Sequence, residues 1–231
     1  MVFNDGDFVK IDYNAWRVAD NKLIYTTNRT VAADNKVLDD ETRYVPQLIV
    51  IGKGNAIKGV ENAVRTMNVS ESKKVELDPK DAFGERDPGL VKVMSVSDFK
   101  KRDIDPYPGM QLDLDGAVAT IKSVNSGRVV VDANHPLAGE RLLYEIKIVS
   151  KLEKGEDKIR AIADTLPLTP DSVAVNGDTV KVTFGGKVEK DSKYLVNKND
   201  FVNLVRRYMD GVAKVTVEED YTRAKQEEAK K

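Results

Sequence analysis

The stretch Ile49-Val-Ile-Gly-Lys-Gly-Asn-Ala-Ile-Lys-Gly-Val-Glu-Asn-Ala-Val64 decides the fold of this chain. It begins inside a β-prone run, Gln47–Ile51, whose branched apolar residues are typical of a central strand. Gly52 and Gly54 then mark a turn. Beyond the turn, apolar residues recur at the spacing of an amphipathic helix with one buried face: Val60, Ala63, Val64 and Met67. The stretch therefore predicts a strand that turns into a short helix.

The glycines of this stretch do not form a phosphate-binding loop. Gly54 and Gly59 have the spacing of the Walker motif, but Val60 and Glu61 stand where that motif requires Lys and then Ser or Thr. The side chains that would hold a nucleotide phosphate and its metal ion are therefore missing. We expect no nucleotide site.

Runs of alternating apolar and polar residues on both sides of the stretch predict one antiparallel sheet with the short helix laid across it. The predicted strands cover residues 8–13, 23–27, 47–51, 73–77 and 142–149. The polar segment 28–43, which contains Asp39-Asp40-Glu41, is interpreted as a solvated loop because the ligand spacing of a cation site is absent.

Between the fourth and fifth of these strands the sequence changes character. Short β runs separated by Pro and Gly turns predict a small all-β unit, inserted into the first sheet, with strands at 91–96, 110–114, 118–124 and 128–132. We therefore divide the chain into a discontinuous first domain (1–86 and 137–152), an inserted domain (87–136) and a C-terminal domain (153–231).

The C-terminal domain is predicted to mix helices and strands. A charged linker, 153–157, precedes a helical face that Pro167 ends. Asn176-Gly177-Asp178 predicts the turn of a hairpin, and a later helix has Asp200 as its expected N-cap and Gly211 at its end. A strand at 212–217 and a charged tail at 222–231 complete the domain, and the whole chain is assigned to the α+β class.

Composition excludes several kinds of chemistry. The chain has 231 residues, no Cys, one His, and 37 Lys and Arg against 38 Asp and Glu. Without Cys there is no disulfide framework, thiol nucleophile or zinc ribbon. The balanced charge argues against a nucleic-acid partner, and no apolar run is long enough to span a bilayer. His135 is interpreted as a turn residue bonded to nearby backbone. We expect no metal, no cofactor and a cytoplasmic location.

Rotation about an X–Pro peptide bond needs none of the excluded groups. It breaks no covalent bond and moves no proton, and its barrier of roughly 20 kcal/mol comes from amide resonance. An apolar site lowers that barrier by removing water from the carbonyl, because the twisted amide is less polar than the planar one. Aromatic and aliphatic residues on a sheet, beside a short helix, suffice for this reaction.

The segment 49–64, followed by Val75-Glu-Leu-Asp-Pro-Lys-Asp-Ala-Phe-Gly-Glu-Arg86, closely resembles the FKBP-type peptidyl-prolyl isomerases. The segment Val131-Asp-Ala-Asn-His-Pro-Leu-Ala-Gly139 is similar to the end of the insert-in-flap domain in the SlyD-like branch. With its extra C-terminal domain, the chain is most similar to the long archaeal type. The resemblance implies an FKBP antiparallel sheet wrapped on a short helix, an insert-in-flap domain and a separate α+β C-terminal domain.

The resemblance also implies the site residues. The implied catalytic residues are Tyr13, Tyr25, Ile57, Phe83 and Tyr144, with the Ile57 N–H binding a substrate carbonyl. The implied substrate-binding residues of the pocket are Ile24, Ile49, Ala56 and Val60, with Val60 as the pocket floor. In the inserted domain, the implied binding residues for unfolded chains are Val93, Met94, Val96, Phe99, Tyr107 and Met110.

Three positions depart from the family pattern. Tyr25 stands where the family usually has Asp, Phe83 replaces a Tyr, and Val60 replaces a larger residue. The loss of one hydrogen bond costs about 1 kcal/mol, which is several-fold in rate. Two functions therefore remain: a prolyl isomerase with chaperone activity, and a holdase with a vestigial pocket. The implied partners are unfolded or nascent polypeptides with X–Pro bonds and a macrolide ligand, with a homodimer through the C-terminal domain.

Overall fold

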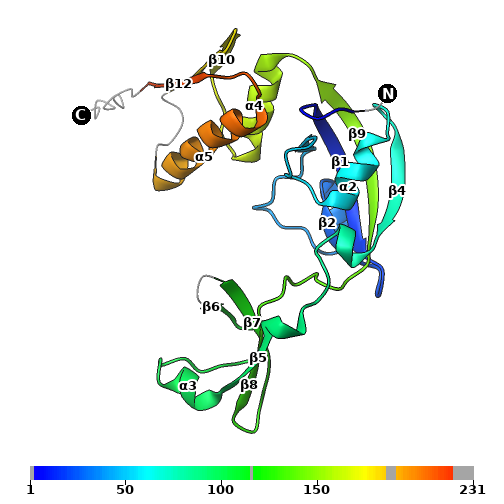
Figure 1. Ribbon diagram of the computed structural model, residues 1–231, viewed down its shortest axis with the longest axis vertical. Helices are drawn as coiled ribbons and strands as arrows, with labels where there is room; N and C mark the ends of the chain where they lie inside the picture. The colour runs from blue at the N-terminus through cyan, green and yellow to red at the C-terminus, as the bar shows by residue number, and fades with distance from the viewer. Residues whose placement is uncertain (1–2, 115–116, 186–190, 221–231) are drawn as a thin grey trace, which may run out of the picture. The chain divides into compact units, whose positions relative to one another are not determined.

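The computed structural model describes residues 3–114, 117–185 and 191–220, which form three β-sheets and five α-helices (Figure 1). These residues divide into two compact units. The first is formed from the described residues of Met1–Trp16, Leu23–Val75 and Leu143–Lys231. The second is formed from Arg17–Lys22 and the described residues of Glu76–Leu142. No described helix is long and apolar enough to cross a membrane.

The first sheet contains the five strands that the sequence predicts. Its strand order is β2-β1-β9-β4, and β3 pairs antiparallel with β1. The strands are β1 (Phe8–Arg17), β2 (Lys22–Thr26), β3 (Gln47–Val50), β4 (Ser72–Leu77) and β9 (Leu142–Leu152). The expected strand positions are confirmed, although β1 and β9 extend beyond the predicted ranges.

Both faces of this sheet carry apolar residues. In the register of β1 and β3, Val9 pairs with Ile49 and Phe8 pairs with Val50. Because successive residues of a strand point to opposite faces, Val9 and Ile49 share one face, which we name the inner face. Phe8 and Val50 share the other, the outer face. All four side chains are buried, so each face is covered by another element.

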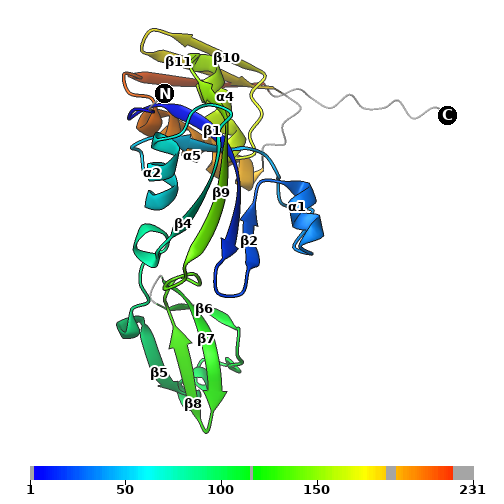
Figure 2. The same ribbon diagram turned by 90° about the vertical axis from the view of Figure 1, so that its right-hand side faces the viewer.

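Helix α2 (Lys58–Arg65) lies across this sheet, as the two views show (Figures 1 and 2). Its buried residues include Val60, Ala63 and Val64, which confirms the predicted apolar face. The turn before it requires glycine at position 52. Gly52 has φ +78°, and a Cβ there would lie 2.8 Å from the Asp5 carboxyl carbon.

The sequence predicted a loop between β2 and β3, but part of this segment is helical. Helix α1 (Arg29–Asp34) forms there, and the Asn28 side chain accepts the Thr30 N–H at 2.9 Å as its N-cap. Periodicity could not predict this helix because it is one and a half turns long and only Ala32 is buried.

Helix α4 (Gly155–Thr165) begins earlier than expected, because Lys154 is its N-cap and Gly155–Asp157 of the predicted linker form its first turn. The predicted hairpin is confirmed as β10 (Ser172–Asn176) and β11 (Thr179–Phe184). The last strand, β12 (Lys214–Glu219), pairs parallel with β11. The tail at 222–231 lies outside the described residues.

Helix α5 (Ser192–Tyr208) corrects the expected N-cap. Its N-cap is Asp191, whose carboxylate accepts the Tyr194 N–H at 2.7 Å. Asp200 lies inside the helix, exposed to solvent. Either Asp side chain could cap a helix. The start of the helix is set by tertiary packing, which buries Tyr194, Phe201 and Val205 on this longer helix.

The outer face of the first sheet shares one core with the C-terminal elements. Phe8, Leu48 and Val50 pack in the same buried cluster as Ile159, Ile162 and the residues of β11 and α5. Charged groups reinforce this packing: Lys53 Nζ lies 2.7 Å from the Asp210 carboxylate. The C-terminal elements therefore belong to the same compact unit as the sheet. The boundaries of the three-domain division stay a prediction.

The second unit contains a four-stranded sheet of order β5-β8-β7-β6, which we name the inserted sheet. Its strands are β5 (Val91–Ser95), β6 (Gln111–Leu114), β7 (Ala117–Asn125) and β8 (Arg128–Asp132). The expectation of an all-β unit is wrong in one respect, because α3 (Val96–Lys100) follows β5. The Ser95 hydroxyl accepts the Ser97 N–H, which caps this helix. Two short 3-10 helices precede β5, Pro79–Asp81 and Pro88–Leu90.

Candidate functional site

Three of the predicted catalytic residues, Tyr13, Tyr25 and Tyr144, gather on the first sheet, and we name them the tyrosine cluster. The ring centroids of Tyr13 and Tyr144 lie 5.7 Å apart, with planes tilted by 32°. Burial raises the pKa of both phenols, and the neighbouring Tyr25 raises both pKa values further. The phenols of Tyr13 and Tyr144 therefore stay neutral at physiological pH.

The cluster has one exposed member. Tyr144 is buried and Tyr13 is half-buried, whereas 43% of Tyr25 is exposed to solvent. Tyr25 belongs to β2, which ends the strand order of the sheet. Tyr25 is therefore the member of the cluster most exposed to solvent.

The predicted apolar residues differ in their placement. Ile49 and Val60 are buried, and Ala56 is half-buried just before α2. Ile24 precedes Tyr25 along β2, so its side chain points to the other face. Thr26, two residues further along the same strand, bonds Asn14 on the outer face at 2.6 Å, which agrees with this alternation. The Ile24 side chain therefore points away from the face that carries Tyr13 and Tyr144.

Ile57 is the N-cap of α2, with the extended backbone angles φ −64° and ψ 146°. Its carbonyl accepts the Glu61 N–H at 3.0 Å, whereas its own N–H donates to no acceptor within the described ranges. The first N–H groups of a helix lack partners inside the helix and carry a partial positive charge. The Ile57 N–H is thus available to a carbonyl oxygen.

Asn55 fixes the backbone before Ile57, and sequence reasoning did not identify it. Its side chain accepts the Val50 N–H at 3.0 Å and donates to the Leu48 carbonyl at 2.9 Å. One side chain thus closes the turn between β3 and α2. The only sequence signal is that Asn is a common turn residue.

Phe83 lies in the second unit, after the 3-10 helix at Pro79–Asp81. Its ring stacks on the His135 ring, with centroids 4.3 Å apart and planes within 2° of parallel. The His135 Nδ1 accepts the Leu137 N–H at 3.1 Å, which confirms its interpretation as a turn residue. Phe83, just before the inserted segment, is therefore in contact with His135 near the end of that segment.

Further contacts join the same two segments. Arg86 forms an ion pair with the Asp132 carboxylate, which is 2% exposed. The Asp87 N–H donates to the Asn134 side chain at 2.8 Å, and the Asn134 amide donates to the Asp87 carbonyl at 2.9 Å. The Gly139 N–H donates to the Gly84 carbonyl at 2.8 Å. The two ends of the inserted segment are therefore held side by side.

The predicted binding residues of the inserted domain separate into two groups. Phe99 is a core residue, and Met94, Val96 and Met110 pack against that core. Val93 and Tyr107 are exposed, Val93 by 64%. Val118, which sequence reasoning did not single out, is 67% exposed. Val93 and Val118 each alternate with a core-facing neighbour, Met94 and Ala119, so both point away from the core.

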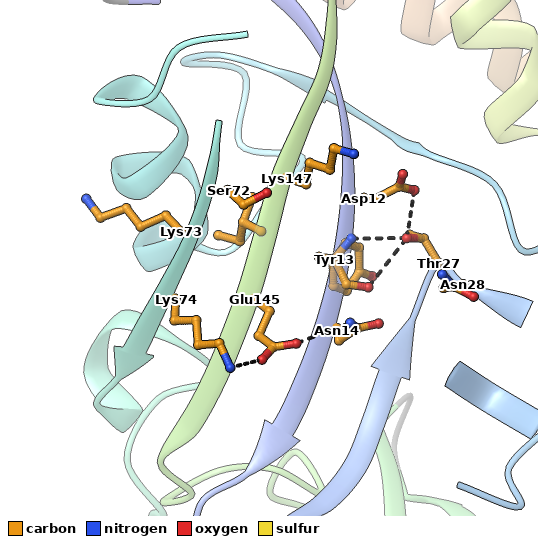
Figure 3. Close-up of a pocket in the computed structure, with 11 residues that line it drawn as sticks. Asp12, Tyr13, Asn14, Thr27, Asn28, Ser72, Lys73, Lys74, Glu145 and Lys147 are labelled. Atoms are coloured by element: carbon orange, nitrogen blue, oxygen red, sulfur yellow. Dashed lines mark hydrogen bonds and ion pairs between the residues drawn. The ribbon is translucent and has the colours of Figure 1, made fainter. Parts of the chain in front are cut away.

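A polar pocket of about 500 Å³ lies on the first sheet and shares Tyr13 with the tyrosine cluster (Figure 3). Residues of three strands, β1, β4 and β9, line it together with Thr27 and Asn28, which follow β2. Tyr13 is one of the lining residues, between Asp12 and Asn14 on β1. Glu145 forms an ion pair with Lys74, and Asp12 accepts the Thr27 hydroxyl at 2.9 Å. These charged and paired groups do not suit an apolar, desolvating site.

Comparison with known proteins matches the chain to two described families. Residues 2–101 match the family described as FKBP-type peptidyl-prolyl cis-trans isomerase, and residues 92–137 match the family described as FKBP26, IF domain. A short-type peptidyl-prolyl cis-trans isomerase of Methanocaldococcus jannaschii is 37% identical over 143 residues, which are 62% of this chain and 90% of that protein.

Two bacterial relatives are SlyD proteins. The FKBP-type peptidyl-prolyl cis-trans isomerase SlyD of Helicobacter pylori is 30% identical over 136 residues, or 54% of this chain and 69% of that protein. SlyD of Escherichia coli K12 is 26% identical over 147 residues, or 62% of this chain and 74% of that protein. The chain therefore belongs to the FKBP-type peptidyl-prolyl cis-trans isomerase family and is SlyD-like.

Proposed function

We propose that the tyrosine cluster and the Ile57 N–H form the site where this enzyme isomerises X–Pro bonds of unfolded polypeptides, and that the inserted sheet holds those polypeptides. The observation that carries the proposal is the pair of tyrosine rings at 5.7 Å, with Tyr144 buried and Tyr13 half-buried, together with the Ile57 N–H at the start of α2, which donates to no acceptor among the described residues. Neutral aromatic rings and one donor are what an uncharged reaction needs.

The rotation lowers the polarity of the amide, because resonance between nitrogen and carbonyl is lost as the bond twists. Rings that exclude water from the carbonyl remove hydrogen bonds that favour the planar form. The Ile57 N–H would hold a carbonyl of the substrate so that the chain bends as the bond turns. No bond is broken and no proton is transferred, so neutral phenols are compatible with every step.

Holding of unfolded chains is assigned to the exposed apolar face of the inserted sheet. Val93 and Val118 lie on that face, and Val93 pairs in register with Val130. Exposed apolar residues on one face of a sheet can serve as anchors for an apolar segment of another chain. A tether between the inserted sheet and the catalytic site would raise the local concentration of proline-containing segments.

The test separates the two roles. We would measure isomerisation of a proline tetrapeptide, proline-limited refolding of a protein, and suppression of aggregation. Tyr13→Ala should lower both isomerase rates, whereas Val93→Ser with Val118→Ser should lower refolding and aggregation suppression alone. Val18→Ser is the matched control, because Val18 is 40% exposed and lies outside the inserted sheet. Unchanged rates in Tyr13→Ala would refute the catalytic assignment.

A deletion of residues 87–136 tests the same division of labour. The hydrogen bond between Gly84 and Gly139 holds the chain ends together, so a short connection can replace the insert. The deletion should spare the tetrapeptide rate and lower refolding of the protein. If it spares refolding but abolishes the peptide rate, the role of the insert is wrong.

A holdase without useful catalysis is the second candidate. It is favoured by Tyr25 and Phe83, which lack the carboxylate and hydroxyl that the resemblance leads us to expect. This function predicts aggregation suppression with a tetrapeptide rate close to the uncatalysed one. The measurements above distinguish it from an isomerase directly.

A further inference from the structure

Beside β2, which ends the strand order of the first sheet, lies a pocket of about 270 Å³ that apolar, aromatic and a few polar residues line. We name it the edge pocket, and its lining residues are Leu23, Ile24, Tyr25, Thr26, Val37, Asp39, Thr42 and Tyr44. We propose that the edge pocket binds an apolar side chain of the polypeptide substrate, close in sequence to the proline, and so determines which X–Pro bonds are isomerised. This inference deepens the proposed function, on which it rests.

The walls of the edge pocket suit an apolar side chain. The two tyrosines Tyr25 and Tyr44 line it together with Val37, which is 40% exposed. Small-molecule pockets are typically about 300–1,000 Å³, so this pocket fits one large side chain better than a whole ligand. Exposed apolar residues are also concentrated around it, since Leu38 and Val45 belong to the same segment.

The loop that forms the outer wall is held in shape by hydrogen bonds. The Asp39 carboxylate accepts the Thr42 hydroxyl at 2.7 Å and the Glu41 N–H at 3.0 Å. The Asp39 N–H donates to the Tyr44 phenol oxygen at 3.0 Å, and the Val37 N–H donates to the Ala32 carbonyl at 3.0 Å. The pocket therefore exists before a substrate binds, and little ordering cost accompanies binding.

The occupant follows from the position and charge of the pocket. Tyr25 belongs both to the tyrosine cluster and to the edge pocket, so a chain bound at the cluster continues into the pocket. Within the described residues, neither Asp39 nor Glu41 pairs with a cation. A Lys or Arg beside the apolar residue would complement these carboxylates. The preferred substrate is thus an extended segment with an apolar and a basic residue near the proline.

The test uses peptides with one constant X–Pro core. One series carries Phe-Lys two to four residues before or after the proline, and the matched series carries Ala-Glu there. We expect the native chain to bind and isomerise the best Phe-Lys peptide roughly tenfold better than its Ala-Glu counterpart, because an apolar side chain leaves water. Binding is measured by fluorescence anisotropy, independently of catalysis.

Adjacent residues supply a matched pair of variants. Val37 lines the pocket and Leu38 does not, yet they are 40% and 41% exposed. Val37→Asp should remove the preference for Phe-Lys, and Leu38→Asp should keep it. Leu38→Asp, which lies outside the pocket, should isomerise an unflanked tetrapeptide at the native rate. Equal preferences in the two variants, or no preference in the native chain, would overturn the inference.

Two further measurements keep the result interpretable. If Val37→Asp lowers the melting temperature, Val37→Ser and Leu38→Ser replace the pair, with the same expected contrast. If no peptide is isomerised but Val37→Asp still loses the binding preference, the proposed catalysis fails and the edge pocket stands. If the tetrapeptide is isomerised and flanking residues never matter, the edge pocket fails alone.

Discussion

The rings of Tyr13 and Tyr144 lie with their centroids 5.7 Å apart on the neighbouring strands β1 and β9. Burial raises the pKa of both phenols, so the pair is a neutral aromatic surface. Each ring also packs into the sheet, so the proposed catalytic role and the stability of the sheet would depend on the same contact.

Substitutions in this pair should separate the two contributions. Tyr144→Ala should lower the free energy of unfolding by about 3–5 kcal/mol, because Tyr144 is buried. Tyr13→Ala should lower kcat/KM on a tetrapeptide at least tenfold, as a wall of the desolvated site is lost. Tyr144→Phe keeps the ring and is the control. Denaturant titration and the peptide assay measure both effects, and a fully active Tyr13→Ala would contradict the assignment.

Ile57→Pro tests the backbone donor with little strain. The φ of Ile57, −64°, is the value that proline prefers, and the N–H that would be lost makes no bond among the described residues. We expect a several-fold loss of kcat/KM with a small change in melting temperature. Ile57→Ala removes the same side chain and retains the donor, so it should be the more active variant. Equal activity in the two would exclude the N–H from the mechanism.

Tyr25→Asp and Phe83→Tyr restore the carboxylate and the hydroxyl that the family usually has at these two positions. Each should raise the tetrapeptide rate several-fold if one additional hydrogen bond of about 1 kcal/mol forms in the transition state. Tyr107→Asp, which changes an exposed tyrosine of the second unit in the same way, should leave that rate unchanged. A lower rate in Tyr25→Asp would mean that the aromatic ring of Tyr25 contributes to catalysis more than a carboxylate would.

Acid should destabilise the second unit through Asp132. Burial opposes ionisation of this carboxylate, but hydrogen bonds from Asn134 and the charges of Arg86 and Lys122 hold its pKa below the usual range. Its stabilisation is therefore present above the unfolded pKa of about 3.9 and is lost as pH falls through the lower folded value.

Asp132→Asn should consequently be less stable than the native chain at pH 7, and the difference should shrink towards pH 3. Urea denaturation at several pH values, followed by a probe in the second unit, measures it. Asp98→Asn is the control, because Asp98 is exposed and pairs only with Lys101 among the described residues. If the difference in unfolding free energy between Asp132→Asn and the native chain stays constant with pH, the charge of Asp132 does not contribute to stability.

A chain that ends at residue 152 should aggregate and melt at a lower temperature than the full chain. Phe8, Leu48 and Val50 pack against the C-terminal elements, and truncation would expose them. In the truncated chain, Phe8→Thr with Leu48→Thr should restore solubility. Light scattering and thermal melts report the result. A truncated chain as stable as the full one would show that the shared core contributes little.

Local sequence predicted most elements of this fold. The strand, glycine turn and helix from Gln47 to Met67 formed as expected because their apolar spacing and turn residues agree. Helices α1 and α3 were missed, since each is too short to show periodicity. The N-cap of α5 was misplaced by nine residues because Asp191 and Asp200 are equivalent caps until packing decides between them.

The sequence by itself determined the family, the short helix and the identity of the tyrosines, because these depend on motifs and on neighbours along the chain. Only the tertiary structure decided which face each side chain occupies. A strand's two faces are distinguished by what packs on them, so Phe8 joins the C-terminal core, Ile24 points to the face opposite Tyr13 and Tyr144, and Val118 stays exposed. Long-range register, which no local pattern encodes, fixes those contacts.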